Sequence, residues 1–566
     1  MISNVKIFLR KNLVLHTVYF GFKISFLKVQ YFLLRKKTLK FKIMLLKSDF
    51  IKAYSFFNNE ILKNNNFSFS DFCEFLSLSL RLKNFKYKND LNKIILDYNT
   101  WSPLFYIYLS YRDENKLLNK WIERVFKDDK FLISILQHPE RFSNNEKIFV
   151  SKISKNKEKL LELRFYLKDI ISQMYFNDIQ FNKMNNFFTL DHIISDYLLN
   201  KDVKKKKRLA IINLNPWTQS IGHFYYLDSF IKGVLLGILD YDYIIFSKDP
   251  KSIISNKYLY GLYKKFLDKK FILPKKKNYV ISMPNMDSWR QKNKKFVLAH
   301  EVSKKIQEKW FKKKYLPIVK IPPKDILAGD KLIGNFFRKK KWFCTIHVRE
   351  PGFRLNDHLW LDSGRNAKIE TYKKAIEHIE KNEGFTIRLG QKRKNQFKFK
   401  GFFDYGSSTF KSDFLDMFLI YRAKFNIGTS SGLSFLPIIF GKYRNIFTNL
   451  NLLFFVSIPG SIGIPKLIYS IKKKKIENLR TYEKFDPPLL FYGNKSFKNF
   501  GYKLIENSSE DILMLVQEFL NNFKKKNWNK MLKKRKTFPL NSNKNIYTNN
   551  FIPLPKFFIN KYKKIL

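Results

Sequence analysis

From residue 208 onward the sequence alternates short apolar runs with longer amphipathic stretches, and this alternation constrains the fold more than any other feature. RLAIINLN (208–215) has the composition of a buried strand, and YYLDSFIKGVLLGIL (225–239) repeats apolar residues at the spacing of one helix face. Strand-like and helix-like segments then follow one another repeatedly. The pattern predicts βαβ units and a parallel sheet covered on both faces.

The alternation occurs in two blocks, separated by the proline- and lysine-rich stretch LPIVKIPPKDILAG (316–329), which we interpret as a linker. We therefore predict two Rossmann-like doubly wound domains, at 205–330 and 331–530. Ligands of such sheets bind at the carboxyl ends of the strands, here facing a cleft between the domains. The residues after them, 531–566, are predicted to form a basic, irregular tail.

The first 204 residues follow a different pattern. Apolar residues recur there at spacings of three and four, as in FCEFLSLSLRLKNF (72–85), and Pro and Gly are rare. The basic run KKKKR (204–208) marks the end of this region. We predict an all-α domain at 1–204 and an α/β fold after it.

A net charge of +61 is compatible with a nucleic-acid or membrane partner. Lysine is spread evenly and arginine does not cluster, so we favour compositional drift in an AT-rich genome and expect no specific nucleic-acid partner. The excess charge would still draw the protein to anionic lipid headgroups. Two cysteines, Cys73 and Cys344, are too few for a disulfide framework or a zinc site. We expect a reducing compartment and no metal.

Uncharged apolar runs are shorter than the ~20 residues that a spanning helix needs. The basic, aromatic stretch 1–36 comes closest, and it fits either a helix lying in the headgroup region or an ordinary core helix. We expect a cytoplasmic protein that lies peripherally on the inner face of the membrane.

FCTIHVREPGFR (343–354) is a predicted strand that ends in ionisable side chains. Because side chains alternate along a strand, His347 and Arg349 lie on the same side at its carboxyl end. The guanidinium of Arg349 suits a phosphate or carboxylate, and Glu350 would lie in a turn made by Pro351 and Gly352. An ordinary Arg–Glu pair bridging the strand end to a loop is the alternative.

FNIGTSSGLSFLP (425–437) is a second strand that ends in small residues before a predicted helix, which Pro437 should end or kink. Small residues let the backbone approach a ligand, and the first helical amides favour phosphate. The alternative is a plain capped turn, with Ser430 or Ser431 as N-cap. The candidate ligand-binding residues here are Gly428, Thr429, Ser430, Ser431 and Gly432.

Three further segments carry polar residues where strands end or helices begin. IRLG places Arg388 and Gly390 at a strand end, so that Arg349 and Arg388 could hold a diphosphate between them. PWTQSIGH presents Gly222 and His223 to the cleft from the first domain. A polar loop carries the remaining candidates, Arg365 and Asn366, with Asn366 alternatively an N-cap, and Tyr372 follows in the next helix.

Taken together, residues from about 209 to 470 resemble a family of bacterial glycosyltransferases with the two-Rossmann (GT-B) architecture. The matching segments are IGH (221–223), HVREPGF (347–353), RNAKIETYKKAIEHI (365–379), IRLG (387–390), the stretch 405–433 and IPKLIYS (464–470).

The resemblance implies transfer of a sugar from a nucleotide-diphosphate donor to a surface-polysaccharide or lipopolysaccharide acceptor, glycan or lipid-linked, with no further cofactor. The HxR motif is also similar to that of fucosyltransferases, which implies that Arg349 grips the donor diphosphate. Gln391 departs from the family pattern, where an acidic residue is expected.

An inverting transfer needs a base for the acceptor hydroxyl. Glu350 and His223 are the candidates on the residues alone, and Asp362 is a weaker one. No DxD-type acidic pair occurs in a suitable loop, so we expect the enzyme not to depend on a metal. The competing hypothesis is a non-catalytic basic protein that binds nucleic acid or membrane and retains a relic transferase fold.

Overall fold

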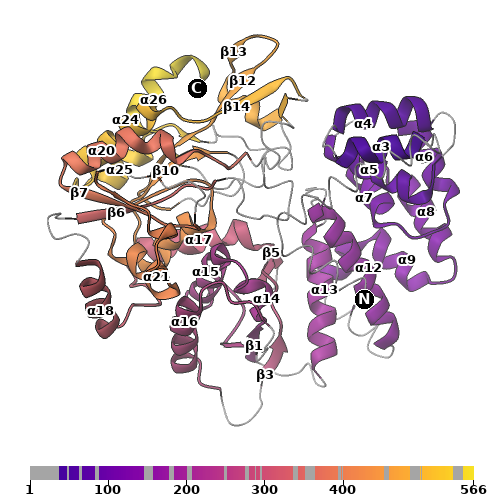
Figure 1. Ribbon diagram of the computed structural model, residues 1–566. Coiled ribbons are helices and arrows are strands. Elements are labelled where there is room, and N and C mark those ends of the chain that lie inside the picture. Colours follow the sequence, from indigo (N-terminus) through magenta and orange to yellow (C-terminus); the bar gives the residue numbers. More distant parts are fainter. Residues whose placement is uncertain are drawn as a thin grey trace. The chain divides into compact units, whose positions relative to one another are not determined.

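The computed structural model divides the chain into two compact units (Figure 1). One comprises Met1–Lys201, Arg354–Leu361 and Asp486–Gly501, and the other comprises Asp202–Phe353, Asp362–Phe485 and Tyr502–Leu566. The residues that the structure describes are 37–46, 50–62, 67–82, 88–145, 149, 157–176, 184–200, 207–247, 252–273, 279–286, 288–292, 296–334, 342–350, 364–392, 397, 400–451, 458–484, 497–498, 500–538 and 552–566. The basic stretch 1–36, the Pro351–Gly352 turn and Asp362 lie outside them.

The first unit is helical over its described residues, as predicted. Its elements are α3 (Lys37–Leu46), α4 (Phe50–Phe56), the π-helix η1 (Phe57–Ile61), α5 (Phe69–Leu82), α6 (Lys88–Asp97), α7 (Pro103–Tyr111), α8 (Asn115–Phe126), α9 (Lys130–Gln137), α10 (Pro139–Ser143), α12 (Lys157–Phe176) and α13 (Met184–Leu199).

Local sequence explains where several of these helices begin. Pro103 and Pro139 occupy the first turns of α7 and α10, where a missing backbone N–H costs nothing. The Asp129 side chain caps α9 by accepting hydrogen bonds from two of its first backbone amides. Helix α8 buries Leu118, Trp121 and Ile122, which follow at the three- and four-residue spacing of one helix face.

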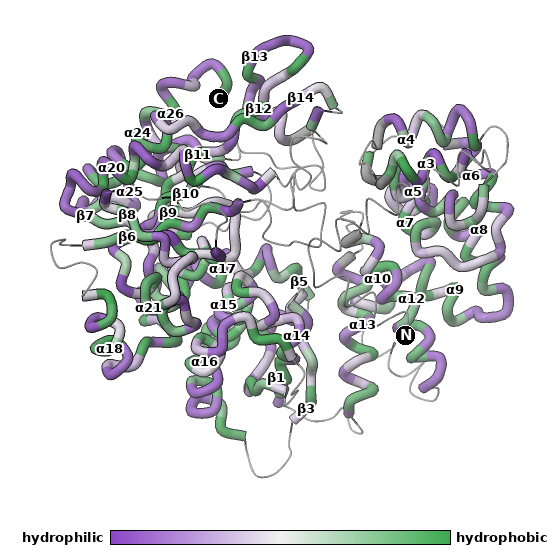
Figure 2. Tube along the Cα trace, in the orientation of Figure 1, coloured by the Kyte–Doolittle hydropathy of each residue, from purple (hydrophilic) through white to green (hydrophobic). Residues whose placement is uncertain are grey.

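The second unit begins with a three-stranded parallel sheet in the order β2-β1-β3. Helix α15, which follows β1, is almost wholly buried, whereas α16 buries only one face and carries hydrophilic residues on the other (Figure 2). The elements of this half are β1 (Lys207–Ile212), α14 (Leu214–Trp217), the 3-10 helix η3 (Ile221–His223), α15 (Phe224–Leu235), β2 (Tyr243–Phe246), α16 (Lys257–Lys270), β3 (Tyr279–Ser282), β4 (Ser288–Arg290), β5 (Phe296–Leu298), α17 (Ala299–Lys312) and α18 (Pro323–Gly334).

The second half is built on a six-stranded parallel sheet in the order β11-β10-β9-β6-β7-β8. In chain order these are the sixth, fifth, fourth, first, second and third strands, the arrangement of a Rossmann sheet. Its elements are β6 (Trp342–His347), the 3-10 helix η4 (Ile369–Tyr372), α20 (Lys373–Lys381), β7 (Gly384–Arg388), β8 (Phe402–Phe403), the 3-10 helix η5 (Tyr405–Ser407), α21 (Asp413–Arg422), β9 (Asn426–Gly428), the 3-10 helix η6 (Gly432–Phe440), β10 (Ile446–Leu450) and β11 (Ile462–Pro465).

Helices cover both faces of this sheet, with α20 and α24 (Ser509–Asn522) on one side and α21 and α18 on the other (Figure 1). The chain changes direction between β6 and β9, which are neighbours in the sheet but not in the sequence. In sheets of this kind, that switch point is where loops from the two sides separate and leave room for a ligand. The prediction of an α/β fold with parallel, Rossmann-like sheets after a helical region is confirmed.

Two local predictions are wrong. The stretch 316–329 is not wholly a linker, because α18 begins within it at Pro323. The tail is not irregular throughout, because residues 552–566 form a strand, an α-helix and a 3-10 helix. The elements after β11 are β12 (Leu467–Ser470), β13 (Lys475–Ile476), the 3-10 helix η7 (Leu479–Lys484), β14 (Tyr502–Ile505), α24 (Ser509–Asn522), α25 (Trp528–Lys533), β15 (Thr537–Phe538), β16 (Ile552–Pro553), α26 (Lys556–Lys561) and the 3-10 helix η9 (Lys563–Ile565).

Candidate functional site

The two strand-end motifs meet at the switch point of the six-stranded sheet. His347 at the end of β6 lies in register with Gly428 at the end of β9. Beyond the strands the backbones stay joined, since the Thr429 amide donates to the His347 carbonyl (3.2 Å) and the Arg349 amide donates to Thr429 Oγ1 (3.0 Å). The HVRE segment (347–350) and the GTSSG segment (428–432) therefore lie side by side at one edge of the sheet, where both were predicted to follow the end of a strand.

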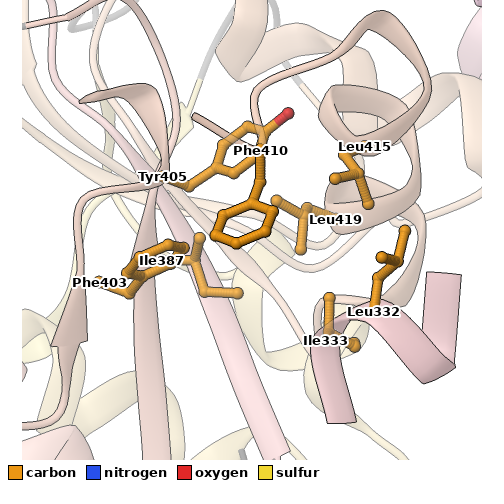
Figure 3. A pocket seen from close by; sticks show the side chains of 8 residues that line it. All are labelled: Leu332, Ile333, Ile387, Phe403, Tyr405, Phe410, Leu415 and Leu419. Atoms are coloured by element: carbon orange, nitrogen blue, oxygen red, sulfur yellow. The ribbon is translucent and has the colours of Figure 1, made fainter. Parts of the chain in front are cut away.

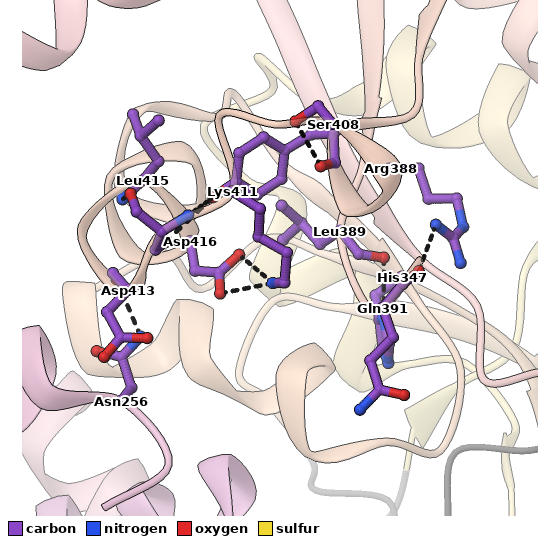
Figure 4. Close-up of polar contacts among 12 residues, drawn as sticks. Asn256, His347, Arg388, Leu389, Gln391, Ser408, Lys411, Asp413, Leu415 and Asp416 are labelled. Carbon is purple, nitrogen blue, oxygen red and sulfur yellow. Dashed lines mark hydrogen bonds and ion pairs between the residues drawn. The ribbon is translucent and has the colours of Figure 1, made fainter. Parts of the chain in front are cut away.

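His347 fixes the GTSSG turn rather than facing solvent. Its Nε2 lies 2.8 Å from Ser431 Oγ, and its Nδ1 lies 3.3 Å from the Leu389 carbonyl, the second of which Figure 4 shows. Burial, together with the charges of Arg388 and Arg349, lowers the pKa of His347 to about 4. A neutral ring donates from Nδ1 to the carbonyl and accepts the serine hydroxyl at Nε2, so at neutral pH His347 positions the turn.

Gly390 lets the backbone that follows β7 approach the imidazole ring of His347 closely. Its φ of +123° lies in a region that side-chain-bearing residues rarely adopt, and a Cβ there would lie 3.2 Å from Nδ1 of His347. Gly390 therefore has a structural role, because it lets the Leu389 carbonyl reach the imidazole, and its part in binding a ligand stays a prediction.

The GTSSG turn is buried and leads into η6, which is a 3-10 helix and not the predicted α-helix. Pro437 lies inside it, where an α-helix would require the missing backbone N–H. Ser431 is the N-cap by position but makes no side-chain capping bond, because its hydroxyl binds His347. Within the described part of the chain, neither Ser430 Oγ nor Ser434 Oγ has a hydrogen-bond partner.

The predicted cationic residues gather around this turn. Arg349 and Arg365 are more than nine-tenths buried, and the Ala367 amide donates to the Arg349 carbonyl (2.8 Å), which brings the Arg365–Asn366 loop beside the end of β6. Lys466, equally buried, donates from Nζ to the Asn366 carbonyl. Arg388, Arg349 and Lys411 also lower the pKa of His347, which places three cationic side chains near its ring.

Arg388 is placed differently from the prediction that it shares a diphosphate with Arg349. Its Nη2 lies 2.9 Å from Glu350 Oε2 and its Nη1 lies 2.7 Å from Asp404 Oδ1. Nη1 also donates to the Gln391 carbonyl at 3.1 Å (Figure 4). Residue 391, which was expected to be acidic, thus contributes only its backbone carbonyl, and the second carboxylate comes from Asp404 at the end of β8.

The first half of the unit reaches the site through IGH (221–223). A Cβ built on Gly222 would lie 2.8 Å from Gly432 Cα, and one built on Gly432 would lie 2.7 Å from Gly222 Cα. The two halves therefore touch backbone to backbone at the GTSSG turn. His223, at the start of α15, places Nδ1 2.7 Å from the Pro216 carbonyl.

Tyr372 requires a correction, because the prediction placed it on the acceptor side. The side chain is fully buried inside the second half, where its hydroxyl contacts Thr448 Oγ1 and accepts from Asn449 Nδ2 (3.2 Å). Burial raises the pKa of this phenol well above its usual value. Tyr372 therefore belongs to the core.

An apolar pocket of about 340 Å³, counting space open to solvent, lies on the α21 side of the sheet (Figure 3). It is lined by Leu332, Ile333, Ile387, Phe403, Tyr405, Phe410, Leu415 and Leu419. No charged side chain lines it, so it does not suit a phosphate, and the polar strand ends are the better candidate site.

Three residues near the site were missed by the sequence analysis. Asp404 follows a strand, FF, and the rule that strand ends carry function would have found it. Lys466 is a lone lysine in the apolar run IGIPKLIYS, which is a recognisable signal of a buried charge. Lys411 binds both carboxylate oxygens of Asp416, at 3.1 and 2.9 Å (Figure 4), and no pattern predicted that pairing.

Comparison of the chain with models of known families found no match. Neither the curated proteins nor the solved structures gave a match. Over the described residues, no group of three or more His, Cys, Asp or Glu side chains could hold a metal ion. None of the described helices is long and apolar enough to cross a membrane.

Proposed function

We propose that the second unit is a glycosyltransferase of the GT-B type, which transfers a sugar from a nucleotide-diphosphate donor. The observation that carries the proposal is the joined end of β6 and β9 at the switch point of the sheet. There a buried arginine, Arg349, is joined by its backbone to a turn of small residues, and Arg388 and Lys411 lie near the same His347 ring. Such a place suits a diphosphate.

The leaving nucleoside diphosphate gains negative charge as the glycosidic bond to it breaks. In this proposal the Arg349 guanidinium and the amides and hydroxyls of the 428–432 turn stabilise that charge, because they are already oriented by His347 and Thr429. Arg365 and Asn366, held beside Arg349, complete the donor side. Ser430 Oγ is a buried hydroxyl available to a donor oxygen.

The acceptor would be approached from the IGH segment, which contacts the turn at Gly432. Two groups are candidates for the base that takes the acceptor proton, Glu350 at the end of β6 and His223 at the start of α15. We propose a surface-polysaccharide or lipopolysaccharide acceptor, glycan or lipid-linked, on the strength of the motif resemblance alone.

A screen against nucleotide sugars tests the proposal. Stabilisation by one nucleotide class in a thermal-shift assay, followed by release of its nucleoside diphosphate on incubation, is the expected result. Arg349→Ala should abolish the release, whereas Arg422→Ala should not, because Arg422 is half-exposed and paired with Asp330 away from the strand ends. Equal release by both variants would refute the role given to Arg349.

We also propose that the protein works on the cytoplasmic side of an anionic membrane. The hairpin between β12 and β13 presents Lys472–Lys475, all exposed, next to Ile471, which is 43% exposed. Each lysine near an anionic bilayer contributes about 1 kcal/mol, and an exposed isoleucine adds apolar contact.

Sedimentation with phosphatidylglycerol vesicles tests this proposal. Replacing the three lysines Lys472–Lys474 by glutamate should weaken binding more than replacing the three exposed lysines Lys312–Lys314 at the end of α17 by glutamate. Equal loss from both variants would assign any binding to the overall charge, and equal binding to neutral phosphatidylcholine vesicles would contradict an anionic partner.

A further inference from the structure

Arg388 and Arg349 end or follow neighbouring strands of one sheet, yet their surroundings differ. The Arg388 guanidinium is clamped by three groups from three consecutive strand ends: Glu350 after β6, Gln391 after β7 and Asp404 after β8. Its side chain is 4% exposed. A guanidinium that already binds two carboxylates has most of its fork occupied.

Charge and packing both argue against a phosphate at Arg388. One arginine with two carboxylates leaves a net negative group, which would repel a diphosphate. The η5 turn also lies directly on the guanidinium, since a Cβ on Gly406 would lie 2.8 Å from Nη1 of Arg388. A ligand of either Nη atom of Arg388 would have to displace a carboxylate, and a ligand of Nη1 would have to displace this turn as well.

The three groups bound to Arg388 are not equally accessible. The Asp404 side chain is 11% exposed and that of Glu350 is 20% exposed. Glu350 directly follows Arg349 in the chain, and Nη2 of Arg388 binds one oxygen of the Glu350 carboxylate. This carboxylate therefore lies beside the candidate donor site. Asp404 anchors the far side of the clamp, which fixes the direction in which Arg388 holds Glu350.

We propose that Arg388 is a positioning residue, which orients the Glu350 carboxylate toward the acceptor hydroxyl and does not itself contact the donor diphosphate. The proposal rests on the glycosyltransferase function proposed above. In the reaction, the acceptor O–H gives its proton to Glu350 as the acceptor oxygen bonds to the sugar. The sugar–phosphate bond breaks, and its electron pair leaves with the nucleoside diphosphate.

The test separates binding from turnover in four proteins: the wild type, Arg388→Gln, Glu350→Gln and the double variant. We expect Arg388→Gln to bind the nucleoside diphosphate within about threefold of the wild type, because only the reacting geometry changes. Its kcat should fall about 100-fold or more, as expected when a general base is lost. The double variant should be no slower than Glu350→Gln alone, because both changes remove one function.

Two results would overturn the inference while leaving the proposed function intact. One is a loss of nucleoside-diphosphate affinity in Arg388→Gln as large as that in Arg349→Ala, which would make Arg388 a direct ligand. The other is a double variant whose kcat falls by the product of the two single losses. A wild-type protein that neither binds nor turns over any donor would instead overturn the proposed function and this inference with it.

Folding of the variants is checked by circular dichroism before the kinetics. If Arg388→Gln does not fold, Arg388→Lys takes its place, because lysine keeps the positive charge but cannot bridge two carboxylates with one planar fork. The same affinity, kcat and double-variant comparisons then apply, with Glu350→Gln as the partner change. Asp404→Asn, which loosens the clamp from its far side, should lower kcat less than Arg388→Gln.

Discussion

The two halves of the second unit each bury a cluster of charged side chains, and the clusters differ in how their polar groups are paired. In the first half, Lys232 and Asp228 form an ion pair (2.7 Å) in which both side chains are fully buried. Gln307 bridges the pair, donating to Asp228 Oδ2 (2.7 Å) and accepting from Lys232 Nζ (3.0 Å), and the Tyr263 hydroxyl donates to Asp228 Oδ1 (2.9 Å). Opposite charges cancel inside this network.

The cluster at the ends of β6 and β9 is organised differently. Arg349 and Arg365 are buried there, burial lowers the pKa of His347, and the Ser430 hydroxyl is buried without a partner among the described residues. A fully paired network needs nothing from outside the protein, whereas a buried hydroxyl without a described partner at the strand ends can still bind a ligand. Burial of charge alone therefore does not identify a site.

The largest expected effect is on the balanced network. Lys232→Met should lower the free energy of unfolding by about 3–5 kcal/mol, because it leaves the Asp228 carboxylate buried without its cation. The double variant Lys232→Met/Asp228→Asn should lose less. Urea unfolding measures both. A double variant at least as unstable as the single one would show that the pair is not a coupled unit.

Acidification should destabilise the cluster at the ends of β6 and β9. The pKa of His347 is about 6.5 in the unfolded chain and about 4 in the folded protein. Between pH 6.5 and pH 4 the unfolded chain is therefore protonated at this residue while the folded protein stays neutral there. Stability from this group is complete above pH 6.5 and is lost as the pH falls, by about 3 kcal/mol near pH 4.

Comparison of the wild type with His347→Asn isolates this contribution. The stability difference between the two proteins should shrink by about 3 kcal/mol from pH 7 to pH 4 in guanidinium unfolding. His378→Asn is the matched control, since burial also lowers the pKa of His378 but this side chain is more exposed. An unchanged His347 difference across the two pH values would contradict the buried, neutral ring.

A smaller effect is expected where the two halves touch. Gly432→Ala would place a methyl group 2.7 Å from Gly222 Cα, and backbone atoms on both sides must shift, which should cost about 1–3 kcal/mol. Gly261→Ala in α16 has open space around it and should stabilise by about 1 kcal/mol through helix propensity. Thermal unfolding of the two variants should therefore show shifts of opposite sign.

The smallest effect concerns Ser430. Ser430→Ala removes a buried hydroxyl that has no partner among the described residues, so the free energy of unfolding should change by less than about 1 kcal/mol. Affinity for the nucleoside diphosphate should nevertheless fall about tenfold, the equivalent of one hydrogen bond. Affinity equal to that of the wild type would remove Ser430 from the donor site.

The positions of His347 and Arg349 could be predicted because two simple regularities apply to them. Side chains alternate along a strand, and parallel strands present their carboxyl ends at one edge. The helix α18 was missed although its signals are local: Pro323 lies in its first turn and Asp325 follows there. These two residues predict a helix start, and a helix from Pro323 would have replaced the second part of the predicted linker.

Other features depend on packing that no local pattern records. Tyr372 lies on a helical turn whose face toward the core was not known, so a polar tip suggested function where the structure shows burial. The capture of Arg388 by Asp404 and Glu350 depends on which loops converge across three strands. The contact between Gly222 and Gly432 depends on how two sheets dock.

The central claim is that the end of β6 and β9 binds the diphosphate of a nucleotide sugar, and calorimetric titration with a panel of nucleoside diphosphates tests it most directly. One nucleoside diphosphate should bind the wild type and Arg422→Ala equally, and Arg349→Ala should bind it about 100-fold more weakly or worse, since charged hydrogen bonds are lost. Failure of every nucleoside diphosphate to bind the wild type, or equal binding by Arg349→Ala, would contradict the account.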